Sequence, residues 1–182
     1  EQAERFRASV AGRHTVTSKT RRDQDRSESH PRFPVDGSFE NVADTDFTVP
    51  ANREWLHRHL NSYQPINPPL VESIAKIDDA IELARTAQAE WAATSWATRR
   101  TILAQVADVL EERRGEAIAA EAHFMGKTVR ESDPEISEGI DFVTYAAHLT
   151  LQHEEYEKHG LRWTPHPVTV VAGPWNFPYA IP

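Results

Sequence analysis

The chain of 182 residues carries 20 basic and 28 acidic side chains, a net charge of −8, and no cysteine. The acidic balance argues against nucleic-acid binding, which needs a clustered positive field, and the missing cysteines exclude disulfides, thiolate metal ligands and a thiol nucleophile within these residues. No apolar run approaches the roughly 20 residues of a membrane-spanning helix, and a reducing, cytoplasmic setting is expected.

Residues 1–34 are expected to be the end of a preceding domain followed by a flexible linker. Apolar residues recur at helical spacing up to Arg13, which is typical of the end of a helix. From His14 to Pro31 the composition is almost entirely polar and charged, so this stretch buries too little apolar surface to offset its ordering entropy. The chain starts without Met and stops straight after an apolar segment. Both ends are therefore expected to be cuts through a longer protein, with residues 35–182 as a truncated domain.

The region after the linker is expected to be mainly helical. An irregular stretch is predicted at Phe33–Val49, and Pro50 suits the first turn of a helix that runs to about Tyr63. Apolar residues three and four apart then predict three helices: one capped by Ser73 and continuing through Trp91, one at Thr98–His123, and one at Pro134–Tyr156, with Gly126 and Gly160 as stops. Their apolar positions are Ile74, Ile77, Ile81, Ala84 and Trp91 in the first helix, Ile102, Val106, Val109, Leu110 and Ile118 in the second, and Ile136, Ile140, Val143 and Ala147 in the third.

The last segment has the composition of a buried β-strand. Val168–Ala172 is continuous and mostly β-branched, and it is bounded by Pro167 and Gly173, a pattern typical of a parallel strand buried on both faces. Helices followed by such a strand predict an α/β domain. The residues after Gly173 would then lie at the carboxyl end of the strand, where open α/β sheets bind ligands. The alternative is a packed corner in which Asn176 is satisfied by backbone hydrogen bonds.

Several stretches of this chain resemble the aldehyde dehydrogenase superfamily. Val168–Pro182, VTVVAGPWNFPYAIP, is similar to its oxyanion-hole motif, Lys76–Arg114 to its pair of N-terminal helices, and Gly126-Lys127-Thr128 to its Gly-Lys turn. Glu131–Tyr145 looks like the glutamate-γ-semialdehyde (pyrroline-5-carboxylate) dehydrogenases. Asn41–Trp55 resembles the bifunctional proline-utilisation enzymes of bacteria, in which an FAD-dependent proline dehydrogenase domain precedes. The resemblance implies the N-terminal helical part and first strand of an incomplete, NAD-binding Rossmann-like domain.

The resemblance also implies a reaction and a set of site residues. In that reaction a cysteine thiolate attacks L-glutamate-γ-semialdehyde, hydride passes to NAD, and water releases glutamate. Asn176 matches the oxyanion-hole asparagine, whose side-chain N–H stabilises charge on the aldehyde oxygen. Pro174 and Trp175 match the part of the motif that lines the nicotinamide nucleotide. Phe177 matches an aromatic residue beside the substrate channel, and Glu138 aligns with a glutamate near the substrate.

The expected partners are a small aldehyde, the remainder of the same polypeptide and, in the full-length protein, further copies of itself. The catalytic cysteine and the general-base glutamate would lie beyond Pro182, so these residues alone are expected to be inactive. No metal site is expected, because His57 and His59 face different sides of a helix and no HExxH pattern occurs. Two alternatives stay open: a dehydrogenase for another small aldehyde, and a non-catalytic helical interaction module if the natural gene ends at Pro182.

Overall fold

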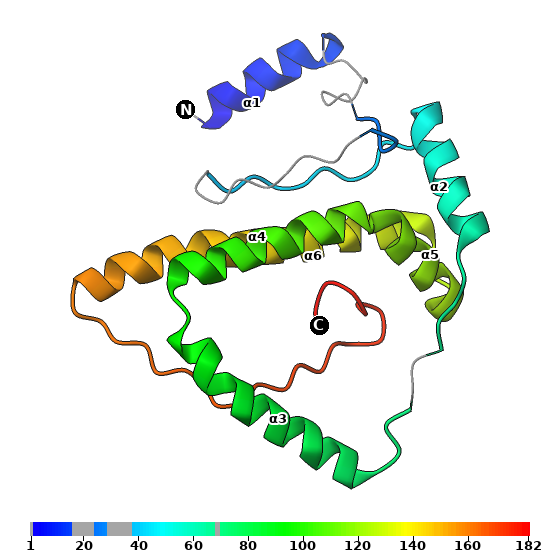
Figure 1. Cartoon of the computed structure of the whole chain (residues 1–182). Helices are drawn as coiled ribbons and strands as arrows, with labels where there is room; N and C mark the ends of the chain where they lie inside the picture. The colour runs from blue at the N-terminus through cyan, green and yellow to red at the C-terminus, as the bar shows by residue number, and fades with distance from the viewer. Residues whose placement is uncertain (1, 16–23, 29–37, 68–69) are drawn as a thin grey trace.

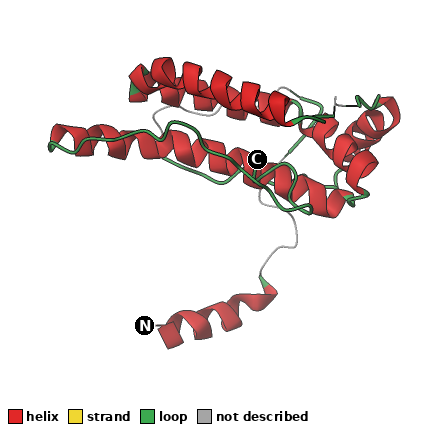
Figure 2. Cartoon of the chain, turned by 90° about the horizontal axis from the view of Figure 1, so that it is seen from below, coloured by secondary structure: helices red, strands yellow, loops and turns green. Residues whose placement is uncertain are grey.

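The computed structural model describes residues 2–15, 24–28, 38–67 and 70–182, and all regular structure in these ranges is helical. The helices are α1 (Gln2–Ala11), the 3₁₀ helix η1 (Gly12–His14), α2 (Pro50–Ser62), α3 (Ile74–Ala93), α4 (Trp96–Glu112), α5 (Arg114–Met125) and α6 (Val129–Lys158). The helices α4 and α6 lie along each other, and α5 packs against α6 and α2, whereas α1 and α3 stand apart from this group (Figures 1 and 2). None of the described helices is both long and apolar enough to cross a membrane.

Most helix ends follow the local signals that predicted them. The stretch predicted to be irregular at Phe33–Val49 is irregular from residue 38 onward, its first residues lying outside the described ranges, and α2 begins at Pro50. The Ser73 hydroxyl caps α3 by accepting the Lys76 N–H at 3.3 Å. At the end of α5, Gly126 takes a φ of 66°, in the left-handed region that favours glycine. These predictions are confirmed.

The single helix predicted at Thr98–His123 is wrong, because the chain leaves helical geometry at Arg113 and starts again as α5. Gly115, two residues further on, lies against α2. A Cβ atom at Gly115 would lie 2.4 Å from the His59 ring of α2, so only a glycine lets the two helices approach this closely. The break lets α5 pack on α2 while α4 packs on α6.

The third predicted helix starts earlier than expected, at Val129 rather than Pro134. A capping box begins it: the Thr128 side chain caps the first turn, and the Glu131 carboxylate accepts the Thr128 N–H at 3.0 Å. Pro134 lies within α6, in its second turn, where its missing N–H removes one helical hydrogen bond. The helix ends at Lys158, just before Gly160 with its φ of 90°.

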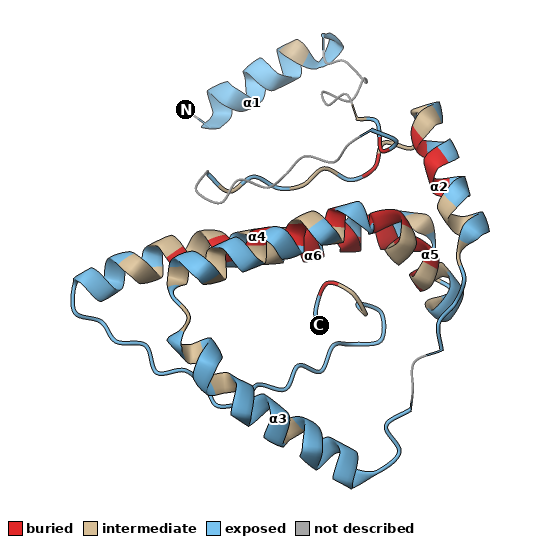
Figure 3. Ribbon diagram, viewed as in Figure 1, coloured by how far each residue is buried: buried red, intermediate tan, exposed pale blue. Residues whose placement is uncertain are grey.

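The core lies where α2, α4, α5 and α6 meet (Figure 3). Its buried members are Trp55, Leu56, Ala107, Ile118, Ile136 and Ile140. The inward positions predicted for the third helix are confirmed at Ile136, Ile140 and Ala147. The apolar stripe predicted for the second helix is confirmed at Ile118, which is buried, and at Leu110, which packs against the core, but Ile102, Val106 and Val109 are exposed. Instead α4 buries its small residues Ala104 and Ala107, because α6 lies close along that face.

The predicted strand at Val168–Ala172 is not a strand in this structure. The segment has no regular structure, and Val170 is 83% exposed. A strand exists by pairing its N–H and C=O groups with a neighbouring strand, and the described residues offer none. The α/β architecture predicted from this segment is therefore absent from the described residues, which are all-helical where they are regular.

Most of the predicted linker His14–Pro31 lies outside the described residues, but Gln24–Glu28 is described and packs on the helices. Arg26 is 7% exposed, and its guanidinium pairs with Glu111 of α4. Its backbone N–H donates to the Asn52 side chain of α2 at 2.8 Å. Arg26 thus packs on the helical core in this structure. The domain division at residue 34 stays a prediction.

Candidate active site

Four of the predicted site residues share one turn near the end of the chain. The Phe177 N–H donates to the Pro174 carbonyl at 3.1 Å, which closes the turn. The indole of Trp175 is 76% exposed, and Asn176 is exposed as well. Only the main-chain oxygen of Asn176 has a hydrogen bond within the described part of the chain; its carboxamide has none there. Within the described residues, the Asn176 side chain therefore lacks the backbone hydrogen bonds that the alternative, a packed corner, requires.

A buried carboxylate on α6 holds the residues that follow this turn. Glu135 is 2% exposed, and its Oε1 accepts two backbone N–H groups, from Tyr179 at 2.8 Å and Ala180 at 3.1 Å. Hydrogen bonds from backbone N–H groups to a charged carboxylate are stronger than those between neutral groups. Nothing in the sequence singled out Glu135, because a charged residue on a helix is ordinarily solvated.

Lys127 joins this carboxylate to the turn itself. Its Nζ pairs with Glu135, lies 3.3 Å from a Glu121 carboxylate oxygen, and donates to the Asn176 main-chain oxygen at 3.1 Å. Burial lowers the pKa of Lys127, but the hydrogen bond to Glu135 and the charge of Glu121 outweigh it and raise the pKa above its usual value. Lys127 therefore stays charged. The sequence marked this lysine only as part of a Gly-Lys turn.

Tyr179 anchors the C-terminal segment on the core. It is partly buried and packs against the apolar cluster, and burial raises the pKa of its phenol to about 12. A Cβ atom added at Gly139 of α6 would lie 3.3 Å from the Tyr179 ring and 3.4 Å from the Ala180 Cα atom. The glycine thus lets the segment lie directly on the helix.

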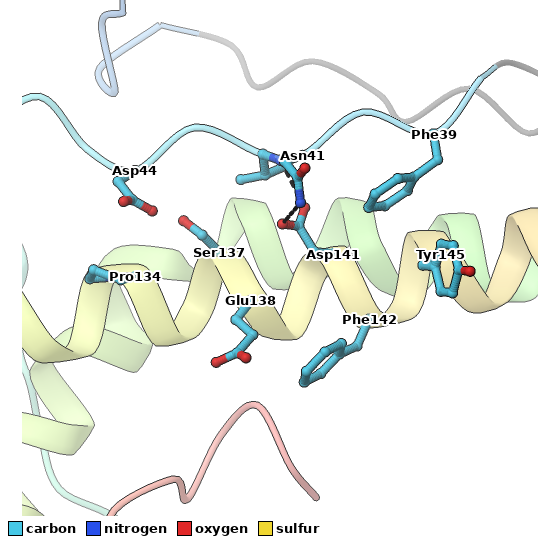
Figure 4. Close-up of a pocket in the computed structure, with 10 residues that line it drawn as sticks. Phe39, Asn41, Asp44, Pro134, Ser137, Glu138, Asp141, Phe142 and Tyr145 are labelled. Carbon is cyan, nitrogen blue, oxygen red and sulfur yellow. Dashed lines mark hydrogen bonds between the residues drawn. The ribbon is translucent and has the colours of Figure 1, made fainter. Parts of the chain in front are cut away.

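Glu138 lies elsewhere on α6, at a shallow hollow of about 520 Å³ (Figure 4). The hollow also contains the carboxylates of Asp44 and Asp141, and the Asp141 carboxylate accepts the Asn41 side-chain N–H at 2.7 Å. Figure 4 shows Glu138 and Phe142 on the side of α6 toward the C-terminal segment, away from Asn41. No hydrogen bond or ion pair joins Glu138 to the Asn176 turn among the described residues. In the same ranges, no group of three or more acidic or histidine side chains is arranged to hold a metal ion.

Four buried charges fix the start of α6 relative to α4. Arg114 is fully buried, and its guanidinium binds Glu111 at 2.8 Å and Asp133 at 3.1 Å. Arg26 also pairs with Glu111, and the Thr45 hydroxyl donates to Asp133 at 2.5 Å. Two cations and two anions balance, which is the condition for keeping ion pairs out of water. We call Arg26, Glu111, Arg114 and Asp133 the buried charge cluster.

Comparison with known proteins places most of these helices in one family. The model of the Aldehyde dehydrogenase family matches residues 66–182. The 1-pyrroline-5-carboxylate dehydrogenase of Staphylococcus saprophyticus is 30% identical over 138 residues, which are 66% of this chain and 27% of that protein. The 1-pyrroline-5-carboxylate dehydrogenase 2 of Bacillus subtilis is 35% identical over 112 residues, 57% of this chain and 22% of that protein.

An enzyme with another substrate in its name is similar as well. The alpha-ketoglutaric semialdehyde dehydrogenase of Bacillus subtilis is 32% identical over 149 residues, 72% of this chain and 30% of that protein. The chain thus spans between 22% and 30% of the length of these three relatives. No solved structure matches the chain significantly.

Proposed function

Because the chain belongs to the aldehyde dehydrogenase family, we propose that it supplies the helical part and the oxyanion-binding turn of an NAD-dependent enzyme that oxidises L-glutamate-γ-semialdehyde to glutamate. The observation that carries this proposal is Asn176, an exposed carboxamide on a turn whose main chain is bound by Lys127. The remaining parts of the enzyme, including a cysteine nucleophile, have to come from polypeptide outside these 182 residues, which contain no cysteine.

Asn176 would act on the aldehyde oxygen. When a thiolate adds to the carbonyl carbon, that oxygen gains nearly a full negative charge, and the Asn176 side-chain N–H donates a hydrogen bond to it. A neutral amide suits this place, because it stabilises the oxyanion without binding the thiolate as a salt bridge would. The turn is held before the substrate arrives, so little reorganisation accompanies the reaction.

The residues beside Asn176 fit a nicotinamide cofactor. Trp175 has an exposed indole that the fold of the described residues does not use, and a flat aromatic face of this kind suits a planar ring. Pro174 and Trp175 would line the nicotinamide nucleotide, and Phe177 would flank the substrate. Bound NAD would supply the acceptor for the hydride that leaves the substrate.

Two observations favour glutamate-γ-semialdehyde as the substrate. Two of the relatives are named 1-pyrroline-5-carboxylate dehydrogenases. Glu138 is an exposed carboxylate at a hollow that Asp44 and Asp141 also line, and such a group would attract the ammonium of an amino-acid aldehyde. The resemblance of Asn41–Trp55 supports the finer proposal that an FAD-dependent proline dehydrogenase domain precedes this chain. The alpha-ketoglutaric semialdehyde dehydrogenase supports a second candidate, a dicarboxylic semialdehyde without the amino group.

The test is NADH formation by the complete protein with each of the two aldehydes. We expect turnover, with glutamate-γ-semialdehyde as the better substrate by kcat/KM. Asn176→Ala should lower kcat by about 10²–10³ and leave the melting temperature and the KM for NAD nearly unchanged. Asn61→Ala, an exposed asparagine on α2, is the matched control and should be neutral.

Three outcomes would contradict the proposal. No turnover with either aldehyde would favour the helical interaction module. A preference for alpha-ketoglutaric semialdehyde would overturn the substrate. A normal kcat in Asn176→Ala combined with a loss of about 1–3 kcal/mol of stability would make Asn176 a structural residue.

A further inference from the structure

The turn that carries Asn176 is bound to the helices through its main chain. Glu135 accepts the N–H groups of Tyr179 and Ala180, and Lys127 donates to the carbonyl of Asn176 itself. These three bonds hold peptide groups on both sides of the Pro178 ring, so they fix the path of the backbone and not the rotamer of one side chain.

The two binding residues are themselves held in place. Glu135 is buried and sits on α6 next to Asp133 and Ser137, whose side chains bind the buried Arg114. Lys127 follows Gly126, the left-handed residue that ends α5. Glu135 lies in the second turn of α6, and Lys127 lies in the three-residue connection between α5 and α6, so packed helices hold both residues.

The charge of Lys127 also balances the buried charge of Glu135. Lys127 is the cation between two buried carboxylates, Glu135 and Glu121, which are 2% and 5% exposed. Removing Lys127 leaves two carboxylates side by side, and removing Glu135 leaves the backbone N–H groups of Tyr179 and Ala180 without their acceptor. Either change frees the turn from one of its two attachments.

We propose that Glu135 and Lys127 are positioning residues for Asn176, holding the turn so that the Asn176 carboxamide points at the reacting oxygen. This inference rests on the proposed function, since it assumes that Asn176 binds the oxyanion. Neither Glu135 nor Lys127 would touch the substrate. Their effect on catalysis passes entirely through the place of Asn176, where a shift of about 1 Å costs about 10²-fold in rate.

A double-mutant cycle in the complete protein tests the proposal. Glu135→Ala should lower kcat by about 10²-fold, with the KM for NAD little changed. In an Asn176→Ala background the same change should have little further effect, because there is no carboxamide left to place. Glu135→Gln keeps one acceptor oxygen for the two N–H groups and should restore part of the lost rate. Glu154→Ala, which removes another α6 carboxylate, is the control and should leave kcat unchanged.

Lys127→Met is the second variant, because it removes the hydrogen bond to the Asn176 carbonyl and keeps the carboxylate that accepts the Tyr179 and Ala180 N–H groups. It should show the same non-additivity with Asn176→Ala. Equal losses of kcat with and without the Asn176 carboxamide, in both variants, would overturn the proposal by showing a merely structural role.

Amide hydrogen exchange provides a reading that does not depend on activity. The Tyr179 and Ala180 amides should exchange faster in Glu135→Ala than in the unchanged protein, and Glu154→Ala should not alter them. Unchanged exchange in Glu135→Ala would overturn the attachment itself. Fast exchange together with a normal kcat in Asn176→Ala would leave the attachment standing, but it would overturn the proposed function and the positioning role that depends on it.

Discussion

The helices α3 and α6 both carry apolar residues at three- and four-residue spacing, yet these residues are exposed on α3 and buried on α6 (Figure 3). Within α6, Ile136 and Ile140 are completely buried. Within α3 no residue is buried, and Ile74 and Ile77 are 78% and 50% exposed. The pattern therefore predicts the helix correctly in both places, but only the apolar face of α6 is buried. An apolar stripe indicates that one face of a helix can pack against another element. No described helix packs on that face of α3.

The α6 region depends on charges as well as on apolar contacts. Replacing Arg114 by Met should lower the free energy of unfolding by about 3–5 kcal/mol, because Asp133 is left buried without the cation it pairs with, and Glu111 keeps Arg26 but loses its second cation. Urea denaturation of the complete protein measures this loss. Arg113→Met is the matched control: Arg113 is exposed and, among the described residues, pairs with the half-buried Glu116, so its loss should change the stability much less. Equal effects of the two variants would show that the buried charge cluster contributes little.

A pair of isoleucines tests the comparison between the two helices directly. Ile136→Ala on α6 should cost about 2–5 kcal/mol of stability, because it opens a cavity in the core. Ile77→Ala on α3 should change stability by less than about 0.5 kcal/mol if this face is exposed in the complete protein too. A large loss for Ile77→Ala would show instead that the rest of the polypeptide or a second copy covers α3.

Within the C-terminal segment, Tyr179 is partly buried, as the α6 region is, whereas Trp175 is exposed, as α3 is. Burial raises the pKa of Tyr179 to about 12, above the ordinary value of 10.0. Above pH 10 the unfolded chain releases this proton while the folded chain keeps it, so stability should be complete below pH 10 and fall as pH rises toward 12. Thermal unfolding across this range measures the loss, and Tyr179→Phe should remove it. An equal pH dependence in Tyr179→Phe would mean that this phenol is not the group responsible.

Local signals predicted most of the helices but only part of their arrangement. Pro50, Ser73 and Gly126 mark helix ends because their backbone chemistry acts within one turn, and the structure agrees at all three. The break at Arg113 was not predictable from such signals. It accompanies the close approach of Gly115 to His59, two residues that are remote in the sequence.

The candidate site shows the same division. A motif read along the chain identified the turn at Pro174–Phe177, and those residues do share one turn. Glu135 was missed because a helical glutamate is ordinarily a solvated residue, and only the fold reveals that it is buried against two backbone N–H groups. Arg26 was missed for a similar reason, since its neighbours are all polar. The strand predicted at Val168–Ala172 is absent because a strand needs a neighbouring strand to pair with, and the described residues offer none.

The buried charge cluster joins segments that are remote along the chain: Arg26 meets Glu111 across 85 residues, and Thr45 meets Asp133 across 88. Closing loops of this length costs entropy before any contact forms, whereas the turns of α4, α5 and α6 close over four residues. We therefore expect the helices to form before the ion pairs of Arg26 during folding. Contacts that are absent from the folding transition state slow unfolding without speeding folding. We therefore expect the loss of Arg26 to speed unfolding much more than it slows folding, which stopped-flow measurements of both rates would check.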